Sequence, residues 1–252
     1  MFGIEPWAFA LALGVTAFAG FVKGAVGFAM PMIMMSAFGS FLSAETALAL
    51  LILPTLVTNV AQAFRQGWRA AWGSVVKYRL HIAMVVLFIP ISAQFVRFIP
   101  QVWMYGLLGV PITAFAVLQL AGVSLAIAVR HRARAEAGLG VIGGLYGGIS
   151  GIWGPPLIVY LISIGAPKAE TVRVQGVVFL IGAVVLLVSH LTSGVLNAQT
   201  LPASALMMVP AMAGMWLGLK LHDRLNPERF RRWTLVLLAL TGFNLVLRVF
   251  GA

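Results

Sequence analysis

The chain has 252 residues, of which 61% are hydrophobic and 9% are charged, and its mean hydropathy is +1.01. Because soluble domains carry about 25% charged residues, the composition excludes a soluble domain and predicts an integral membrane protein. The net charge of +11 is explained by topology, since Lys and Arg accumulate in cytoplasmic loops, so no nucleic-acid partner is expected, and the absence of cysteine excludes disulfides and thiolate metal sites.

Long apolar runs follow one another along the chain and predict membrane-spanning helices. A span needs about 20 apolar residues, and only a helix satisfies its own backbone inside such a segment. Two further apolar pieces are too short to cross alone, and each follows a Gly-rich break. We expect long helices at about 5–22, 46–65, 80–97, 102–129, 138–153, 171–193, 202–219 and 230–249, and short pieces at about 30–41 and 156–165.

The two Gly-rich breaks, "KGAVGFAMP" and "GGISGIWGPP", match each other. A second match pairs "AET" at 44–46 with "AET" at 169–171. We therefore predict a duplication with an N-terminal repeat at 1–129 and a C-terminal repeat at 130–252. A shift of 124 residues pairs Gly20, Gly24, Gly27 and Pro31 with Gly144, Gly148, Gly151 and Pro155.

Three clusters of basic residues mark loops that should face the cytoplasm. They are Arg65, Arg69, Lys77 and Arg79; Arg130, Arg132 and Arg134; and Lys220, Arg224, Arg229, Arg231 and Arg232. The loops near Arg97 and at 194–201 are poor in positive charge and should face outward. This places the protein in the cell (inner or plasma) membrane as a multi-pass protein with both termini outside.

Counting the crossings between these loops makes 138–165 a hairpin that enters from the cytoplasm and returns, and 5–41 a hairpin that enters from outside. Each repeat is then one re-entrant, broken helical hairpin plus three transmembrane helices. An odd number of spans gives the repeats inverted topology. The predicted fold is therefore an all-α integral membrane protein with two inverted-topology repeats. A plain bundle of eight spans would put the basic cluster at 220–232 outside.

The breaks have two interpretations. Gly140, Gly144 and Gly148 recur every four residues, which is the spacing of small residues at close helix contacts. Packing does not explain the prolines, which lock φ and remove a donor and so predict a helix end. Half-helix N-termini at such a break favour an anion, and broken helices at the midplane are typical of secondary transporters.

The segments "GFVKGAVGFAMP" (20–31) and "GGLYGGISGIWGPP" (143–156) resemble the sulfite exporter TauE/SafE family, and the resemblance covers essentially the whole chain. The family is often Gly-rich up to the proline, whereas here Phe28-Ala29-Met30 and Trp153-Gly154-Pro155 occupy those places. The resemblance implies transport of a small sulfur-containing anion such as sulfite or an organosulfonate.

Candidate substrate-binding residues gather at the breaks and on the helices beside them. Each also has a plainer interpretation: Lys23 as a helix cap, the stripe of Thr55, Asn59 and Gln62 as a bond to a neighbouring helix, Arg173 as a cytoplasmic anchor and His190 as an interfacial histidine. The predicted set is Lys23, Gly24, Gly27, Pro31, Asn59, Gln62, Ser150, Gly151, Trp153, Gly154, Pro155, Pro156 and Gln175, followed by Thr55, Arg173 and His190.

The leading hypothesis is a secondary transporter, most simply an exporter, of a small anion by alternating access around the two breaks. An anion channel that uses the half-helix dipoles as a filter is the alternative. We expect no enzyme, cofactor or metal, because Glu136 and the other acidic residues fall at helix ends or in loops and no catalytic constellation is visible. The coupling ion (H⁺ or Na⁺), a homodimer, the direction of transport, and rocking or elevator motion stay open.

Overall fold

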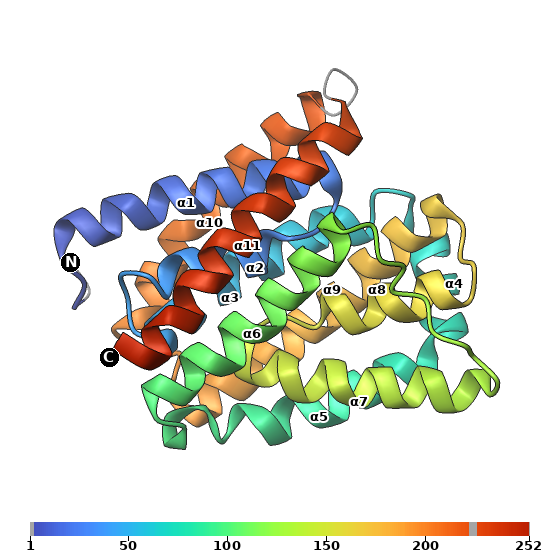
Figure 1. Ribbon diagram of the computed structural model, residues 1–252, viewed down its shortest axis with the longest axis horizontal. Helices are drawn as coiled ribbons and strands as arrows, with labels where there is room; N and C mark the ends of the chain where they lie inside the picture. Colours follow the sequence, from blue (N-terminus) through green and yellow to red (C-terminus); the bar gives the residue numbers. More distant parts are fainter. Residues whose placement is uncertain (1–2, 222–225, 252) are drawn as a thin grey trace.

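The fold was analysed in a computed structural model that describes residues 3–221 and 226–251. Every regular element in this part of the chain is a helix (Figure 1). The all-α class is therefore confirmed. The helices are α1 (Pro6–Val26), α2 (Met30–Phe38), α3 (Ala44–Ala63), α4 (Trp68–Lys77), α5 (Arg79–Ala93), the 3-10 turn η1 (Val96–Phe98), α6 (Gln101–Leu120), α7 (Arg132–Ser150), α8 (Gly154–Ser163), α9 (Lys168–Ser193), α10 (Thr200–Leu221) and α11 (Pro227–Gly251).

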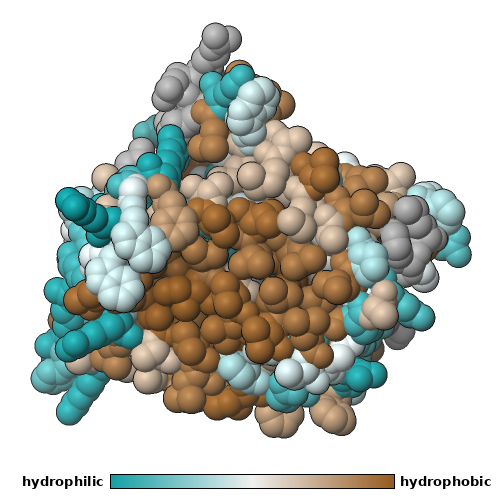
Figure 2. All heavy atoms as spheres, turned by 180° about the vertical axis from the view of Figure 1, so that it is seen from behind, coloured by the Kyte–Doolittle hydropathy of each residue, from teal (hydrophilic) through white to brown (hydrophobic). Residues whose placement is uncertain are grey.

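Seven of the described helices are long and apolar enough to cross a membrane. They are α1, α3, α5 together with η1, α6, α9, α10 and α11. Figure 2 shows one face of the molecule as a broad hydrophobic surface bordered by hydrophilic side chains. Length, hydropathy and this surface establish a multi-pass membrane protein.

The helices pair across the two halves of the sequence. Helix α1 packs along α10, α7 along α5, and α6 along α11, while α3 and α9 lie next to each other between these pairs (Figure 1). The first helix of each hairpin thus packs against a helix from the other half. A duplicated fold in which each half packs a helix against the hairpin of the other half would have this arrangement. The inverted topology itself stays a prediction.

Glycines allow the closest of these contacts. A Cβ atom at Gly20 or Gly24 of α1 would collide with a carbonyl oxygen of α10, and one at Gly148 of α7 would collide with Ser92 of α5. Gly140 and Gly144 meet α5 in the same way. Small residues at a spacing of four therefore bring the helix backbones together, as the packing interpretation predicts.

Both ends of the chain lie at one end of the molecule in Figure 1. Helix α4, the start of α7, the end of α10 and the start of α11 lie at the opposite end. The three basic clusters belong to these segments, although Arg224 lies outside the described residues. A single basic end is what the predicted cytoplasmic side requires, and the orientation across the membrane stays a prediction.

Several predictions for the helices are wrong, among them the start of α7, which is Arg132 and not about 138. The helix expected at 102–129 ends at Leu120, because Gly122 adopts a left-handed φ of +71° and the N–H of Val123 bonds the carbonyl of Leu118 at 3.0 Å. The segment expected to be a loop after residue 65 contains α4. Its residues are amphipathic and too few to register as a span.

Candidate functional site

The first break separates α1 from α2. Gly27 follows α1 with a left-handed φ of +86°, and its N–H bonds the carbonyl of Lys23 at 2.7 Å. Ala29 has a φ of +77°, which an L-residue rarely adopts. Helix α2 then begins at Met30, with Pro31 in its first turn. The break is thus three residues long, and the N-terminus of α2 opens directly onto it.

The second break repeats this geometry between α7 and α8. Gly151 has a φ of +70° and donates to the carbonyl of Gly147 at 2.7 Å. Helix α8 begins at Gly154, with Pro155 in its first turn. The prediction that the prolines end a helix is wrong in detail. The glycines end α1 and α7, and the prolines start α2 and α8, where the missing N–H costs nothing.

A small cavity lies between the two breaks. Its volume is about 30 Å³, which is space for about two water molecules at roughly 10–15 Å³ each. Both breaks, α3 and α9 contribute to its wall. The lining residues are Phe28, Ala29, Pro31, Met32, Thr55, Asn59, Gly151, Ile152, Trp153, Gly154, Pro155, Ile158 and Phe179.

Lys23 lies beside this cavity and is 2% exposed. Its Nζ donates to Thr58 Oγ1 at 2.9 Å and to Asn59 Oδ1. Asn59 in turn donates from Nδ2 to the carbonyl of Phe179 at 3.0 Å. Neither of the two ion pairs seen among the described residues includes Lys23. A buried ammonium that is met only by neutral oxygens favours an anion nearby.

Two polar atoms in the cavity wall are buried and lack hydrogen-bond partners, namely Thr55 Oγ1 and Trp153 Nε1. Most buried polar side-chain atoms in proteins are paired. An indole N–H can only donate, and a threonine hydroxyl can donate as well. Two residues of the cavity wall therefore carry donor groups that no protein atom uses.

Gln62 joins the first break to α9. Its Nε2 donates to the carbonyl of Gly27 at 2.9 Å and to that of Val172 at 3.4 Å, while its Oε1 has no partner. The polar stripe of α3 thus runs from Thr55 in the cavity wall to the turn at Gly27. The side chain holds the turn in place and does not line the cavity.

Other predicted site residues lie away from the cavity. Gly24 packs against α10, Pro156 borders a separate apolar cavity, and Ser150 donates to the carbonyl of Tyr146 at 2.6 Å. His190 bonds the carbonyl of Gly148 through Nε2 at 2.9 Å. Gln175 is buried in α9 outside the lining.

Six lining residues were missing from the prediction. Four of them, Phe28, Ala29, Met32 and Ile152, lie in or next to the breaks and could have been included by position alone. Ile158 lies one turn into α8, where helical spacing from Pro155 would have found it. Nothing in the sequence indicates Phe179, whose ring meets Trp153 edge to face at 6.2 Å.

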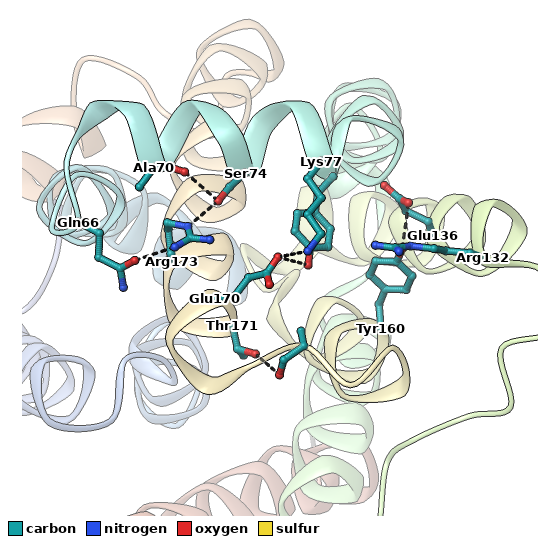
Figure 3. Close-up of polar contacts among 12 residues, drawn as sticks. Gln66, Ala70, Ser74, Lys77, Arg132, Glu136, Tyr160, Glu170, Thr171 and Arg173 are labelled. Atoms are coloured by element: carbon teal, nitrogen blue, oxygen red, sulfur yellow. Dashed lines mark hydrogen bonds and ion pairs between the residues drawn. The ribbon is translucent and has the colours of Figure 1, made fainter.

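A second polar cluster joins five helices at the end of the molecule where α4 lies (Figure 3). It corrects the prediction that Glu136 lies in a loop, because Glu136 is inside α7 and 7% exposed. Its carboxylate accepts from the backbone N–H of His81 at 3.2 Å and from the Tyr160 hydroxyl at 2.9 Å. Arg132 donates to the same hydroxyl at 3.3 Å. Glu136 therefore ties α7 to α5 and α8.

The cluster continues to α9 through Glu170. Lys77 Nζ lies 2.6 Å from the Glu170 carboxylate, and the Tyr78 hydroxyl donates to it at 2.8 Å. Burial and this hydrogen bond raise the pKa of Tyr78, so its hydroxyl stays a donor. The rings of Tyr78 and Tyr160 meet edge to face at 6.2 Å. Together these contacts hold α4, α5, α7, α8 and α9 as one unit.

No group of three or more metal-binding side chains occurs among residues 3–221 and 226–251. The carboxylates of the polar cluster are engaged with tyrosine hydroxyls, Lys77 and the backbone N–H of His81.

The profile of the sulfite exporter TauE/SafE family matches residues 12–245. This match includes both breaks, the cavity and the polar cluster. No curated protein and no solved structure matches the chain.

Proposed function

Because the chain belongs to the sulfite exporter TauE/SafE family of membrane transporters, we propose that it exports a small sulfur-containing anion and binds it in the cavity between the two breaks. The observation that carries the proposal is the pair of unpartnered donors, Thr55 Oγ1 and Trp153 Nε1, in a cavity next to the buried Lys23. Sulfite and organosulfonates present several acceptor oxygens, which suit this arrangement.

The charges at the cavity support anion binding. Helices α2 and α8 begin at the breaks, so the first-turn N–H groups of each carry a partial positive charge there. Lys23, when protonated, adds a positive charge close to the same place, where its Nζ contacts Thr58 and Asn59. An anion would gain from all three sources, and a neutral solute would gain from hydrogen bonds only.

The size of the cavity favours a carrier over a channel. A sulfite ion consists of one sulfur and three oxygen atoms. It is therefore larger than a cavity that has space for about two water molecules. Binding therefore requires the hairpins to move apart, so each transport cycle includes a conformational step. We propose that transport occurs by alternating access. The polar cluster of Glu136, Tyr160, Tyr78 and Glu170 would then close the cavity toward the end of the molecule where α4 lies.

The membrane potential is a sufficient driving force for export of an anion. A monovalent anion that leaves an inside-negative cell gains about 2.3 kcal/mol per 100 mV. The predicted orientation puts the basic end inside, which would attract anions to the cytoplasmic mouth. Coupling to H⁺ or Na⁺ would add to this force.

The test is uptake of radiolabelled sulfite and short-chain sulfonates by proteoliposomes under imposed voltage, pH and Na⁺ gradients. Wild type is compared with Lys23→Met and Gly151→Leu, and Lys220→Met serves as control, because Lys220 lies over the Trp216 ring and does not line the cavity. We expect saturable flux that both site variants lose and the control keeps. Flux that stays unchanged in Lys23→Met, or flux that rises linearly with voltage without saturation, would contradict the proposal.

A further inference from the structure

A large apolar groove lies between α4 and α9, away from the break cavity. Its volume is about 500 Å³, within the roughly 300–1,000 Å³ of ordinary ligand sites. On α9 it extends from Val177 to Val185, which is about 12 Å at 1.5 Å per residue. All lining residues are apolar: Ala63, Phe64, Trp68, Ala71, Trp72, Val75, Val86, Val177, Leu180, Ile181, Val184 and Val185.

Polar contacts along one edge hold α4 above the groove. Arg173 of α9 donates from Nε to Ser74 Oγ and from Nη1 to Gln66 Oε1, both at 2.9 Å (Figure 3). Lys77 at the end of α4 pairs with Glu170 at the start of α9. The helix is thus fixed at its polar face, and the apolar space beneath it is formed in advance of any ligand.

Aromatic rings form one wall of the groove and are open to the surroundings. Phe64 and Trp68 stack with centroids 5.5 Å apart, and Trp68 and Trp72 stack at 6.3 Å. Trp68 and Trp72 are 65% and 57% exposed. Exposed tryptophans on a short amphipathic helix are typical of the level of the lipid headgroups.

Two arginines next to this stack have no partner of opposite charge. Arg65 and Arg69 lie on either side of Trp68 in the sequence, both are exposed, and neither side chain takes part in an ion pair or hydrogen bond within the described residues. A guanidinium binds phosphate oxygens in a bidentate way. Positive charge is therefore available next to the aromatic wall, and the lining of the groove is apolar.

We propose that this groove binds an anionic phospholipid, with one acyl chain against α9 and the headgroup phosphate at Arg65 and Arg69. The charge complementarity selects this occupant over a zwitterionic lipid, and the apolar lining selects an acyl chain over a soluble anion. In Figure 2 hydrophilic side chains border the hydrophobic surface at the side where α4 lies, which is the arrangement a lipid with a charged headgroup requires. The proposal does not depend on the transported substrate.

The test is native mass spectrometry of the purified chain with phosphatidylglycerol and phosphatidylcholine of equal chain length. We expect phosphatidylglycerol to remain bound at least fivefold more than phosphatidylcholine. Arg65→Gln with Arg69→Gln should remove this preference. Val184→Trp, at a groove position that is 46% exposed, should reduce the binding of both lipids by filling the groove.

The matched control is Arg130→Gln with Arg134→Gln, which removes the same charge from two exposed arginines just before and in the first turn of α7. It should leave lipid retention unchanged. Equal retention of both lipids by wild type, or an undiminished preference in the Arg65 and Arg69 variant, would overturn the proposal. The proposal would also be overturned if the wild type were a dimer without bound lipid and Val184→Trp dissociated this dimer. The groove would then be occupied by a second copy of the chain.

Discussion

The two breaks share a backbone geometry and differ in their side chains. Each has a left-handed glycine at the end of its first helix and a proline in the first turn of the next. Beside the first break lie Lys23, Thr58 and Asn59, which are hydrogen-bonded to one another. At the second lie Trp153 and Phe179, which are apolar apart from the indole N–H. The two breaks thus share two helix dipoles, while only the first has a cation and only the second an aromatic wall.

The position that aligns with Lys23 shows why the roles are not interchangeable. It is Gly147, and a Cβ atom there would lie 3.0 Å from the Trp153 ring. A Cβ at Gly182 of α9 would lie 2.7 Å from the same ring. Trp153 therefore occupies the space that a long basic side chain would need. The positive charge of Lys23 is consequently in the N-terminal half of the chain, and the aromatic wall at Trp153 is in the C-terminal half.

The largest effect is expected from removing the cation. Lys23→Met should lower kcat/KM for anion transport by at least about 100-fold, since hydrogen bonds to a charged group contribute about 1.5–3 kcal/mol and the full charge adds to this. The melting temperature should hold or rise, because a buried charge without an acidic partner costs stability. Proteoliposome flux and thermal unfolding in detergent measure the two quantities. Normal transport by this variant would show that the charge of Lys23 does not contribute to anion binding.

Removing one donor from α3 or from the second break should have a smaller effect. Thr55→Val deletes an unpartnered donor and keeps the shape of the side chain, while Trp153→Phe deletes the other donor and leaves a smaller ring, so KM should rise about tenfold in both. Thr113→Val is the matched control, because the Thr113 hydroxyl is also buried and unpartnered but lies against Gly242 of α11. If only one of the two site variants responds, the anion contacts either α3 or the second break and not both.

A several-fold change is expected at the polar cluster. Tyr160→Phe removes a donor to Glu136 and should loosen α8 from α7 within the second hairpin. Because the chain contains no cysteine, Ile158→Cys reports directly on access to the cavity wall. Alkylation of this cysteine should be several-fold faster with Tyr160→Phe and unchanged with Tyr105→Phe, which lies on α6. Equal rates would show that the cluster does not restrain the hairpin.

The smallest effect concerns the two left-handed glycines. Gly27→Ala should cost about 1 kcal/mol, because φ is +86° but nothing lies within 4 Å of a Cβ atom there. Gly151→Ala should cost more, since its Cβ would lie 2.6 Å from Leu51 as well. Melting temperatures in detergent should fall in that order. The reverse order would mean that the second break relaxes more readily than the first.

Much of the fold followed from local patterns. The long apolar runs predicted α1, α3, α9, α10 and α11 because hydropathy and length are properties of one segment. The short pieces predicted α2 and α8 for the same reason. Helix α4 and the end of α6 were missed, because a ten-residue amphipathic helix has no span-like signal and a single glycine ends α6 within an apolar run.

By itself the sequence determined the membrane class, the positions of the two breaks and the presence of Lys23 at the first, since glycine, proline and charge act on the backbone where they stand. Only the tertiary structure decided that Lys23 meets Asn59, that Trp153 lies between Gly147 and Gly182, and that Glu136 is buried beside Tyr160. The physical reason is that burial and hydrogen bonding belong to pairs of segments. Asn59 and its partner Phe179 are 120 residues apart, and no local pattern records which distant helix a side chain will meet.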